Sequence, residues 1–155
     1  MKLVITSAVL LFAFAGTAAA ETFTFKSTST NTKSINIATG ASSGIGATFN
    51  EGESQVMSDS GKKSTTQNEC AAWSTPPGSQ FTTSGVCKFS EGGSNEATIT
   101  FTCLADAKAG SADCWGGLRG VSGTRVGKNG TISWRQTQNP DGVSGVATGT
   151  GMWND

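Results

Sequence analysis

Apolar and polar residues alternate with a period of two in many short stretches of this chain. In residues 98–103 the odd positions are Ile, Phe and Cys, whereas the even positions are threonines. Such alternation is typical of a β-strand with one face in a core and the other in water. No stretch of apolar residues at helical spacing is long enough to predict a helix. Strands are predicted at 22–26, 33–38, 45–50, 53–59, 62–70, 81–89, 98–103, 112–119, 131–135 and 143–152.

The composition of the chain agrees with this pattern. Gly, Ser and Thr make up 58 of the 135 residues from position 21 onward. Threonine suits a half-exposed pleated surface, and Gly and Ser mark turns. We therefore predict an all-β fold, a single small antiparallel β-barrel of about eight strands, with a β-sandwich as the alternative. No linker or change of composition divides residues 21–155, which indicates one domain, and Asn129-Gly130 predicts a tight hairpin turn.

The first twenty residues have a different character. Lys2 precedes an apolar run of about a dozen residues, and Ala18-Ala19-Ala20 places small side chains just before Glu21, as in a secretory signal peptide. The run is shorter than the ~20 residues that a membrane-spanning helix needs. We therefore expect cleavage near Ala20, a secreted or periplasmic protein and no membrane insertion. A buried N-terminal helix is the alternative, and the strand pattern that follows directly disfavours it.

The four cysteines allow three pairings. Cys70 and Cys87 are centred on the turn sequence Pro-Pro-Gly-Ser, and Cys103 and Cys114 are centred on Lys-Ala-Gly. Each pair therefore brackets one hairpin, and an exported protein meets an oxidising environment. We predict the disulfides Cys70–Cys87 and Cys103–Cys114. A zinc site of four thiolates is the alternative, but no Cys-x-x-Cys spacing supports it, so no metal is expected.

Missing residue types and the charge balance exclude several functions. The chain has no His and no Tyr, which removes His-based catalytic relays, imidazole-bound metals and phenol chemistry. Removing the first twenty residues leaves 10 basic against 11 acidic residues, a net charge of −1. A nucleic-acid-binding domain would carry a clear cationic excess, so no nucleic-acid partner is expected.

Residues Thr39–Gly46 match the glycine-rich dinucleotide-binding loop of short-chain dehydrogenases. Such a loop works because a helix follows it and offers its N-terminus to the pyrophosphate. Here the following residues alternate as a strand, and the Tyr that this family needs for catalysis is absent. We interpret the segment as a Gly/Ser hairpin and expect neither a dinucleotide nor another cofactor.

A glycine-dense stretch carries the one family resemblance of the chain. Residues 116–123 read GGLRGVSG, and residues 127–134 read GKNGTISW. Together they resemble the exported bacterial relatives of the allene oxide cyclase-like and dirigent-like barrels, as do, less fully, residues 69–89. The resemblance implies a closed eight-stranded barrel with an apolar interior cavity. In enzymatic relatives it implies a cavity that guides a reactive substrate by shape, with one carboxylate and an ordered water. We carry over the fold and the cavity, not the reaction.

Large aromatic and charged residues supply the candidate site. Each Trp either fills the core or lines a ligand pocket. If the interior holds a polar site, we expect Trp115, Trp134 and Gln136 to share it with a carboxylate such as Glu69 or Asp113. Three arginines and Lys128 between residues 119 and 135 form a cationic stretch that either receives an anionic ligand or is a solvated hairpin. The candidate ligand-binding residues are Trp73, Trp115, Trp134, Gln136, Glu69 and Arg119.

Three functions remain open at this point. The first is an exported barrel that binds or sequesters a small, largely apolar molecule without chemistry. The second is a cyclase, isomerase or stereochemical guide that acts by confinement, although no catalytic site stands out. The third is a structural or protein-interaction domain. A cavity above roughly 300 Å³ with a buried carboxylate favours the enzyme, the same cavity lined by apolar groups and amides favours the binder, and a filled barrel with an exposed apolar patch favours the interaction domain. The oligomeric state does not follow from the sequence.

Overall fold

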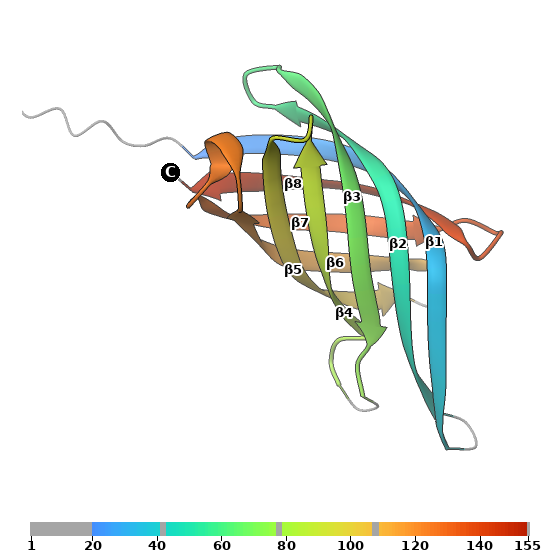
Figure 1. Ribbon diagram of the computed structural model, residues 1–155. Helices are drawn as coiled ribbons and strands as arrows, with labels where there is room; N and C mark the ends of the chain where they lie inside the picture. The colour runs from blue at the N-terminus through green and yellow to red at the C-terminus, as the bar shows by residue number, and fades with distance from the viewer. Residues whose placement is uncertain (1–19, 41–42, 77–78, 107–108, 155) are drawn as a thin grey trace, which may run out of the picture.

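The computed structural model describes residues 20–40, 43–76, 79–106 and 109–154. It is a single closed antiparallel β-barrel, in which each strand pairs with the next and β8 pairs with β1 (Figure 1). This confirms the predicted fold, and the sandwich alternative is wrong. The elements are β1 Glu21–Gly40, β2 Ser43–Ser58, β3 Lys63–Ser74, β4 Thr83–Glu91, β5 Asn95–Asp106, β6 Ser111–Gly120, the short 3₁₀ helix η1 Gly123–Arg125, β7 Asn129–Gln138 and β8 Ser144–Asn154.

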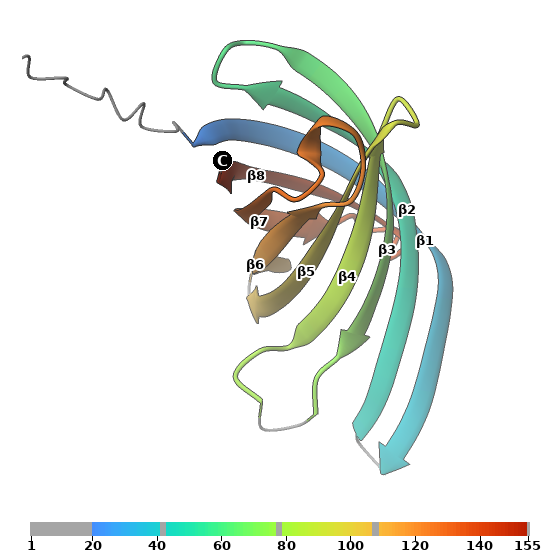
Figure 2. The same cartoon turned by 60° about the vertical axis from the view of Figure 1, so that its left-hand side comes forward.

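Strands β1 and β2 are much longer than predicted. Segments 22–26 and 33–38 form one strand, β1, and segments 45–50 and 53–59 form one strand, β2. The register of β1 against β2 shifts by one residue between Asn31 and Lys33, as at a β-bulge, and the two strands pair on both sides of this shift. Pairing of β1 with β8 ends at Thr30, so the hairpin of β1 and β2 runs past its neighbours (Figures 1 and 2).

The connection between β6 and β7 differs from the predicted hairpin at Asn129-Gly130. Asn129 pairs with Arg119 and Gly130 with Leu118, so both residues belong to β7. The chain turns instead through residues 121–128, which include η1. Gly123 and Gly127 have φ values of 66° and 80° in this segment, a conformation that glycine adopts without a steric penalty.

Both predicted disulfides are confirmed. Cys70 is the register partner of Cys87 on β4, and Cys103 is the register partner of Cys114 on β6. The S–S distances are 2.06 and 2.01 Å. Each disulfide therefore joins two adjacent strands directly across a hairpin, as the symmetric spacing about a turn indicates.

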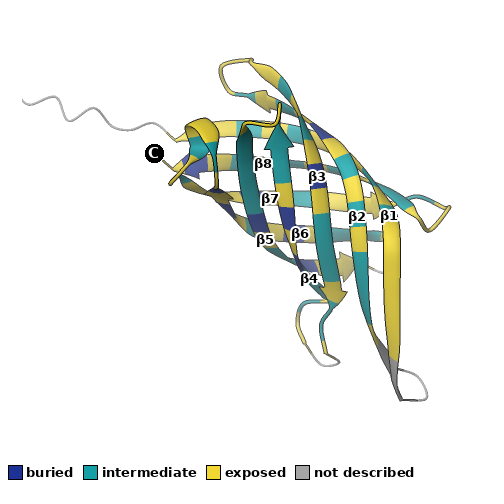
Figure 3. Ribbon diagram, in the orientation of Figure 1, coloured by how far each residue is buried: buried dark blue, intermediate teal, exposed yellow. Residues whose placement is uncertain are grey.

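The core occupies the middle of the barrel and the end where Glu21 and Trp153 pair. Its buried cluster consists of Cys87, Ile99, Leu118, Ile132 and Trp153, and the buried positions are single residues with less buried neighbours on each strand (Figure 3). Gly116 makes room for this packing, because a Cβ atom there would lie 2.8 Å from Cγ2 of Ile99. A side chain at this position would therefore displace the core.

Two sequence features lie partly outside the described residues. The predicted signal peptide occupies residues 1–20, of which 1–19 are outside them. Residues 41–42 of the Thr39–Gly46 segment are also outside them; on either side Gly40 of β1 pairs with Ser43 of β2, and a strand follows in place of a helix. In the described part of the chain, no helix has the length and apolar character to cross a bilayer.

Candidate ligand-binding cavity

The barrel contains a cavity at each end, and the side chains between the two cavities are apolar except for Ser54. The cavity beside the β7–β8 turn has a volume of about 310 Å³, and the one beside Glu21 has about 140 Å³. Phe25, Phe89, Ile99 and Ile132 line both. We call the larger the amide cup, after the side chains described below, and the smaller the charged cavity.

The amide cup arises from a change of residue type along the inward face of the strands. On β1 the inward positions continue from Phe25 to Ser27, Ser29 and Asn31, all of which line the cup. Since side chains alternate between the two faces of a strand, these residues share the face of Phe25. The apolar core thus gives way to a polar wall within a single strand.

The polar part of this lining consists of neutral groups. Amide side chains come from Asn31 on β1, Asn50 on β2, Asn68 on β3, and Gln136 and Gln138 on β7. Among the described residues, the lining holds no Asp, Glu, Lys or Arg. The hydroxyl groups of the lining belong to Ser27, Ser29, Thr48, Ser54, Thr83, Thr137 and Ser144.

Trp134 and Gln136 stand together on one side of the cup. They are two residues apart on the inward face of β7, and Nε1 of Trp134 donates to Oε1 of Gln136 at 3.2 Å. The Trp134 ring meets Phe101 edge to face, with 5.2 Å between the ring centroids. Gly149 on β8 allows this position, because a Cβ atom there would lie 2.6 Å from Cβ of Trp134. The indole is therefore fixed by packing and by a hydrogen bond.

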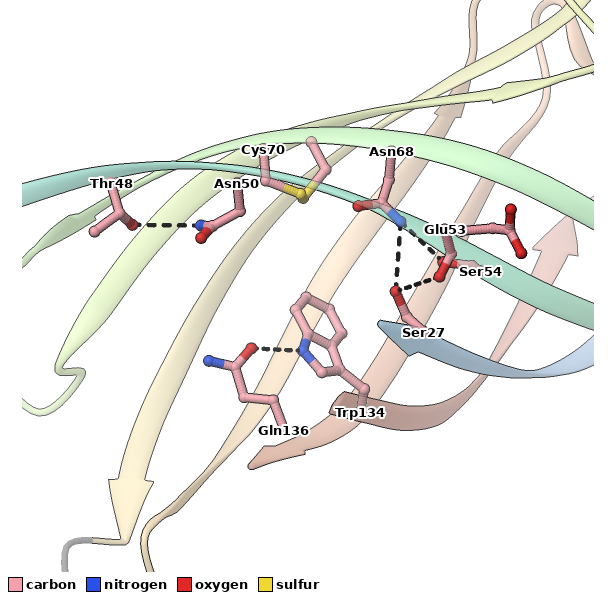
Figure 4. Close-up of a disulfide and its surroundings, with 10 residues drawn as sticks. Ser27, Thr48, Asn50, Glu53, Ser54, Asn68, Cys70, Trp134 and Gln136 are labelled. Atoms are coloured by element: carbon pink, nitrogen blue, oxygen red, sulfur yellow. Dashed lines mark hydrogen bonds between the residues drawn. A yellow bond between two sulfur atoms is a disulfide. The ribbon is translucent and has the colours of Figure 1, made fainter. Parts of the chain in front are cut away.

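The opposite side of the cup comes from β2 and β3 (Figure 4). Nδ2 of Asn68, which is 5% exposed, donates to Oγ of Ser54 at 3.1 Å and to Oγ of Ser27 at 3.4 Å. Nδ2 of Asn50 donates to Oγ1 of Thr48 at 3.4 Å. Figure 4 shows these groups and Cys70 facing the Trp134–Gln136 pair across the interior. Two hydrogen-bonded walls thus face one another.

Part of the hydrogen-bonding capacity of the cup is unused. Oδ1 of Asn31 is buried and accepts no hydrogen bond from the described residues. Its Nδ2 donates to Oγ of Ser34 at 2.8 Å, so the amide is oriented although its oxygen is unpaired. A buried acceptor of this kind has a free-energy cost until a donor reaches it.

The rim of the cup is held by the β7–β8 turn. Oδ1 of Asp141 accepts the backbone N–H groups of Val143 and Ser144, each at 2.8 Å, and Oδ2 accepts the Ser144 hydroxyl at 2.5 Å. The hydroxyl bond of Ser144, followed by the two backbone bonds, holds the pKa of the Asp141 carboxyl below its ordinary value. The ionised carboxylate therefore shapes the turn that carries Val143 and Ser144 into the lining.

The charged cavity has a different character. Arg125, on η1, donates from Nη1 and Nη2 to the two carboxylate oxygens of Glu21 at 2.5 and 2.7 Å. Its guanidinium also lies over the Trp153 ring, 5.1 Å from the centroid. The side chains of Glu21, Arg125 and Trp153 line this cavity, as do those of Lys62, Glu91 and Glu96. The β6–β7 segment is thereby bound to the first residue of β1 at the end opposite the cup.

Only two of the six candidate ligand-binding residues reach the interior. Trp134 and Gln136 line the cup, whereas Trp73 and Trp115 lie on the outer surface, each 45% exposed. Glu69 and Arg119 are also exposed outside the barrel. The structure therefore does not bring Trp115 together with the Trp134–Gln136 pair.

The inward cysteines explain this arrangement. Because Cys70 and Cys114 point inward to form disulfides with Cys87 and Cys103, their neighbours Glu69 and Trp115 point outward. Asp113, the other carboxylate considered, is outside for the same reason, 3.6 Å from Nη1 of Arg135. Alternation counted from the cysteines would have shown this from the sequence.

The same counting would have found the residues that the sequence analysis missed. Asn68 is two positions from Cys70 and therefore shares its inward face. Asn31 lies an even number of positions from Phe25 on β1. Both amides were hidden because an inward polar residue breaks the apolar alternation that identifies strands.

The outer surface carries an apolar patch on the hairpin side of the barrel. Ile35 and Ile37 on β1 and Ile45 and Phe49 on β2 are between 40% and 62% exposed. Ile35 pairs with Ala47, and Ile37 pairs with Ile45, so these side chains share one face of the hairpin. The protein therefore combines an open interior with this external patch.

Comparison with known proteins adds no functional assignment to this geometry. No protein-family model matches the chain, and no curated protein has a significantly similar sequence.

Proposed function

We propose that this protein is an exported barrel that binds a small uncharged molecule in the amide cup without transforming it chemically. The observation that carries the proposal is the 310 Å³ cavity whose described lining consists of amides, hydroxyls and apolar groups. Closed barrels of eight strands are wide enough to hold one small ligand, and this volume is at the lower end of the range of ligand pockets.

The absence of ionisable groups from the described lining determines the charge of the ligand. A charged ligand would lose its hydration in the cup and meet no opposite charge, which is strongly unfavourable. An uncharged molecule avoids this desolvation penalty and still forms hydrogen bonds with the amides. The proposal therefore differs from the largely apolar ligand that the sequence suggests, because it includes polar molecules that carry no charge.

The distribution of carboxylates favours binding over catalysis. In a protein without His, a carboxylate or a Lys is the ordinary general base. The described interior carboxylates, Glu21, Glu91 and Glu96, line the smaller charged cavity. The cup has room for a ligand but holds no such base among its described residues.

Export is the second part of the proposal. Two disulfides are consistent with an oxidising compartment, and the first twenty residues have the pattern of a signal peptide. The resemblance to allene oxide cyclase-like and dirigent-like barrels belongs to the same proposal, with the eight-stranded closed barrel as its support. A binding protein outside the cytoplasm meets its ligand there.

Native mass spectrometry tests the proposal on protein purified from its own extracytoplasmic compartment. The cup is blocked by Ala147→Phe, because Ala147 lies on the inward face of β8 opposite Gln136 and Ser27. Thr148→Phe places the same ring on the outer face and serves as the matched control. We expect a bound neutral mass on the natural protein and the control, and its loss from Ala147→Phe. A mass that remains on a folded Ala147→Phe protein, or no bound mass on the natural protein, would contradict the proposal.

A further inference from the structure

The amide and aromatic groups of the cup restrict the class of ligand further than the requirement that the ligand be uncharged. A purely apolar molecule would cover the amides of Asn50 and Gln136 without offering them hydrogen bonds. Burying such groups unpaired costs more free energy than leaving them in water. Sites built to hydrogen-bond a ligand discriminate strongly against an analogue that lacks the matching groups.

The available hydrogen-bonding atoms are of both kinds. On the β2 wall of the cup, Nδ2 of Asn50 is engaged by Thr48, which leaves Oδ1 of Asn50 as an acceptor without a donor among the described residues. On the facing wall (Figure 4), the oxygen of Gln136 is engaged by Trp134, which leaves the two N–H groups of its Nε2 as donors. A ligand that serves both positions must donate at one point and accept at another. Hydroxyl groups do both.

The same cup offers an aromatic surface beside these atoms. Phe25, Phe101 and Trp134 line it, and the Trp134 ring is held in place by Phe101 and by Gln136. A saturated ring with hydroxyl groups on its edge presents C–H groups above and below its plane. Such a ring can place its apolar face on the indole while its edge reaches the amides.

We infer that the ligand of the amide cup is an uncharged hydroxylated ring of the monosaccharide or cyclic-polyol class. This inference rests on the proposed function, since it names the class of molecule bound at the same site. Its edge hydroxyls donate to Oδ1 of Asn50 and accept from Nε2 of Gln136, and its C–H face lies on Trp134.

Isothermal titration calorimetry with matched probes tests the inference. The positive probes are the methyl pyranosides of glucose, galactose and mannose, and myo-inositol. Tetrahydropyran-2-methanol keeps the ring without its ring hydroxyls, and glucuronate adds a carboxylate. We expect at least one positive probe to bind at least about tenfold more tightly than either of the other two, the effect of one or two lost hydrogen bonds.

Variants assign the binding to the cup. Gln136→Leu removes the donor from an exposed position at the cavity and should weaken the bound positive probe about tenfold. Gln67→Leu, which changes an outward glutamine on β3, should leave its affinity unchanged. Trp134→Phe keeps an aromatic ring at this position and should lose the ligand-dependent change in tryptophan fluorescence. Trp115→Phe, on the outer face, should keep that change.

Each contrary result has a distinct meaning. If tetrahydropyran-2-methanol binds in the cup as tightly as the pyranosides, the hydroxylated class is wrong while the binding function stands. The same holds if no positive probe binds but native mass spectrometry still finds a neutral ligand that Ala147→Phe removes. Tighter binding of glucuronate in the cup would overturn both the inferred class and the uncharged ligand of the proposed function.

Discussion

Removing either disulfide should lower stability by a similar and large amount. Each disulfide closes one hairpin, with sequence separations of 17 residues for Cys70–Cys87 and 11 for Cys103–Cys114. The loop-entropy relation gives about 3 kcal/mol for each, because the cost depends only logarithmically on loop length. Small domains have a total unfolding free energy of about 5–15 kcal/mol, so two such contributions decide whether the barrel is stable.

The assay is thermal and urea unfolding of the two paired alanine variants, Cys70→Ala/Cys87→Ala and Cys103→Ala/Cys114→Ala. For a domain of this size we expect each melting temperature to fall by about 10 °C. Near-equal losses of stability for the two variants indicate that the disulfides act mainly by lowering the entropy of the unfolded chain. Cys103 and Cys114 are 1% exposed, so a much larger loss for this pair would show that native packing carries it instead. Melting temperatures unchanged within about 2 °C would refute the role of the disulfides in stability.

Three further predictions concern packing, the Glu21 end and the rim of the cup. Gly116→Ala should destabilise the barrel by about 1–3 kcal/mol in urea titrations, because the added Cβ would lie 2.8 Å from Cγ2 of Ile99. Gly117→Ala should be near neutral, since the nearest atom to its Cβ is 3.9 Å away, and equal effects of the two variants would contradict this packing. Glu21→Gln should cost about 1 kcal/mol, less at high salt, because the partly exposed ion pair with Arg125 is screened; no change in low-salt unfolding would exclude a stabilising pair. Folding lowers the pKa of Asp141, so the carboxylate stabilises the turn fully above the ordinary Asp pKa and loses this effect as the pH falls through the pKa of the folded state. In an NMR pH titration, the backbone amides of Val143 and Ser144 should shift together, and Asp141→Asn should abolish this transition.

The barrel could be predicted from the sequence because most strands bury apolar residues at alternate positions. The paired cysteines also lie symmetrically about two turns, which is sufficient to assign both disulfides. Strand β1 shows where this reasoning stops. Prediction ended the first segment at Lys26, yet the strand continues with Ser27, Ser29 and Asn31 directed inward.

The reason is physical and is the same for the fold and for the candidate site. Apolar periodicity identifies a strand by its contact with a core, and the inward face of β1 beyond Phe25 lines a cavity. The polar residues that line the cup therefore interrupt the apolar alternation by which the strands would be predicted from the sequence. Gln136 was found because Trp134 marks the inward face two positions earlier.

Charged residues line the cavity at one end of the barrel and neutral residues line the cup at the other. This difference depends on tertiary structure and does not follow from the spacing of residues in the sequence. Arg125 belongs to a stretch of basic residues that reads as a cationic hairpin. In the structure, the β6–β7 segment turns it onto Glu21, 104 residues earlier in the chain, and onto Trp153. The pairing of β8 with β1 brings these positions together, which no local pattern indicates.

The most direct test of the central claim is a crystal structure of the protein purified with its natural ligand from its own compartment. We predict density for one uncharged molecule in the amide cup, between Trp134 and Asn50, within hydrogen-bonding distance of Gln136. A cup that contains ordered water alone, with the copurified molecule bound elsewhere on the barrel, would contradict the account.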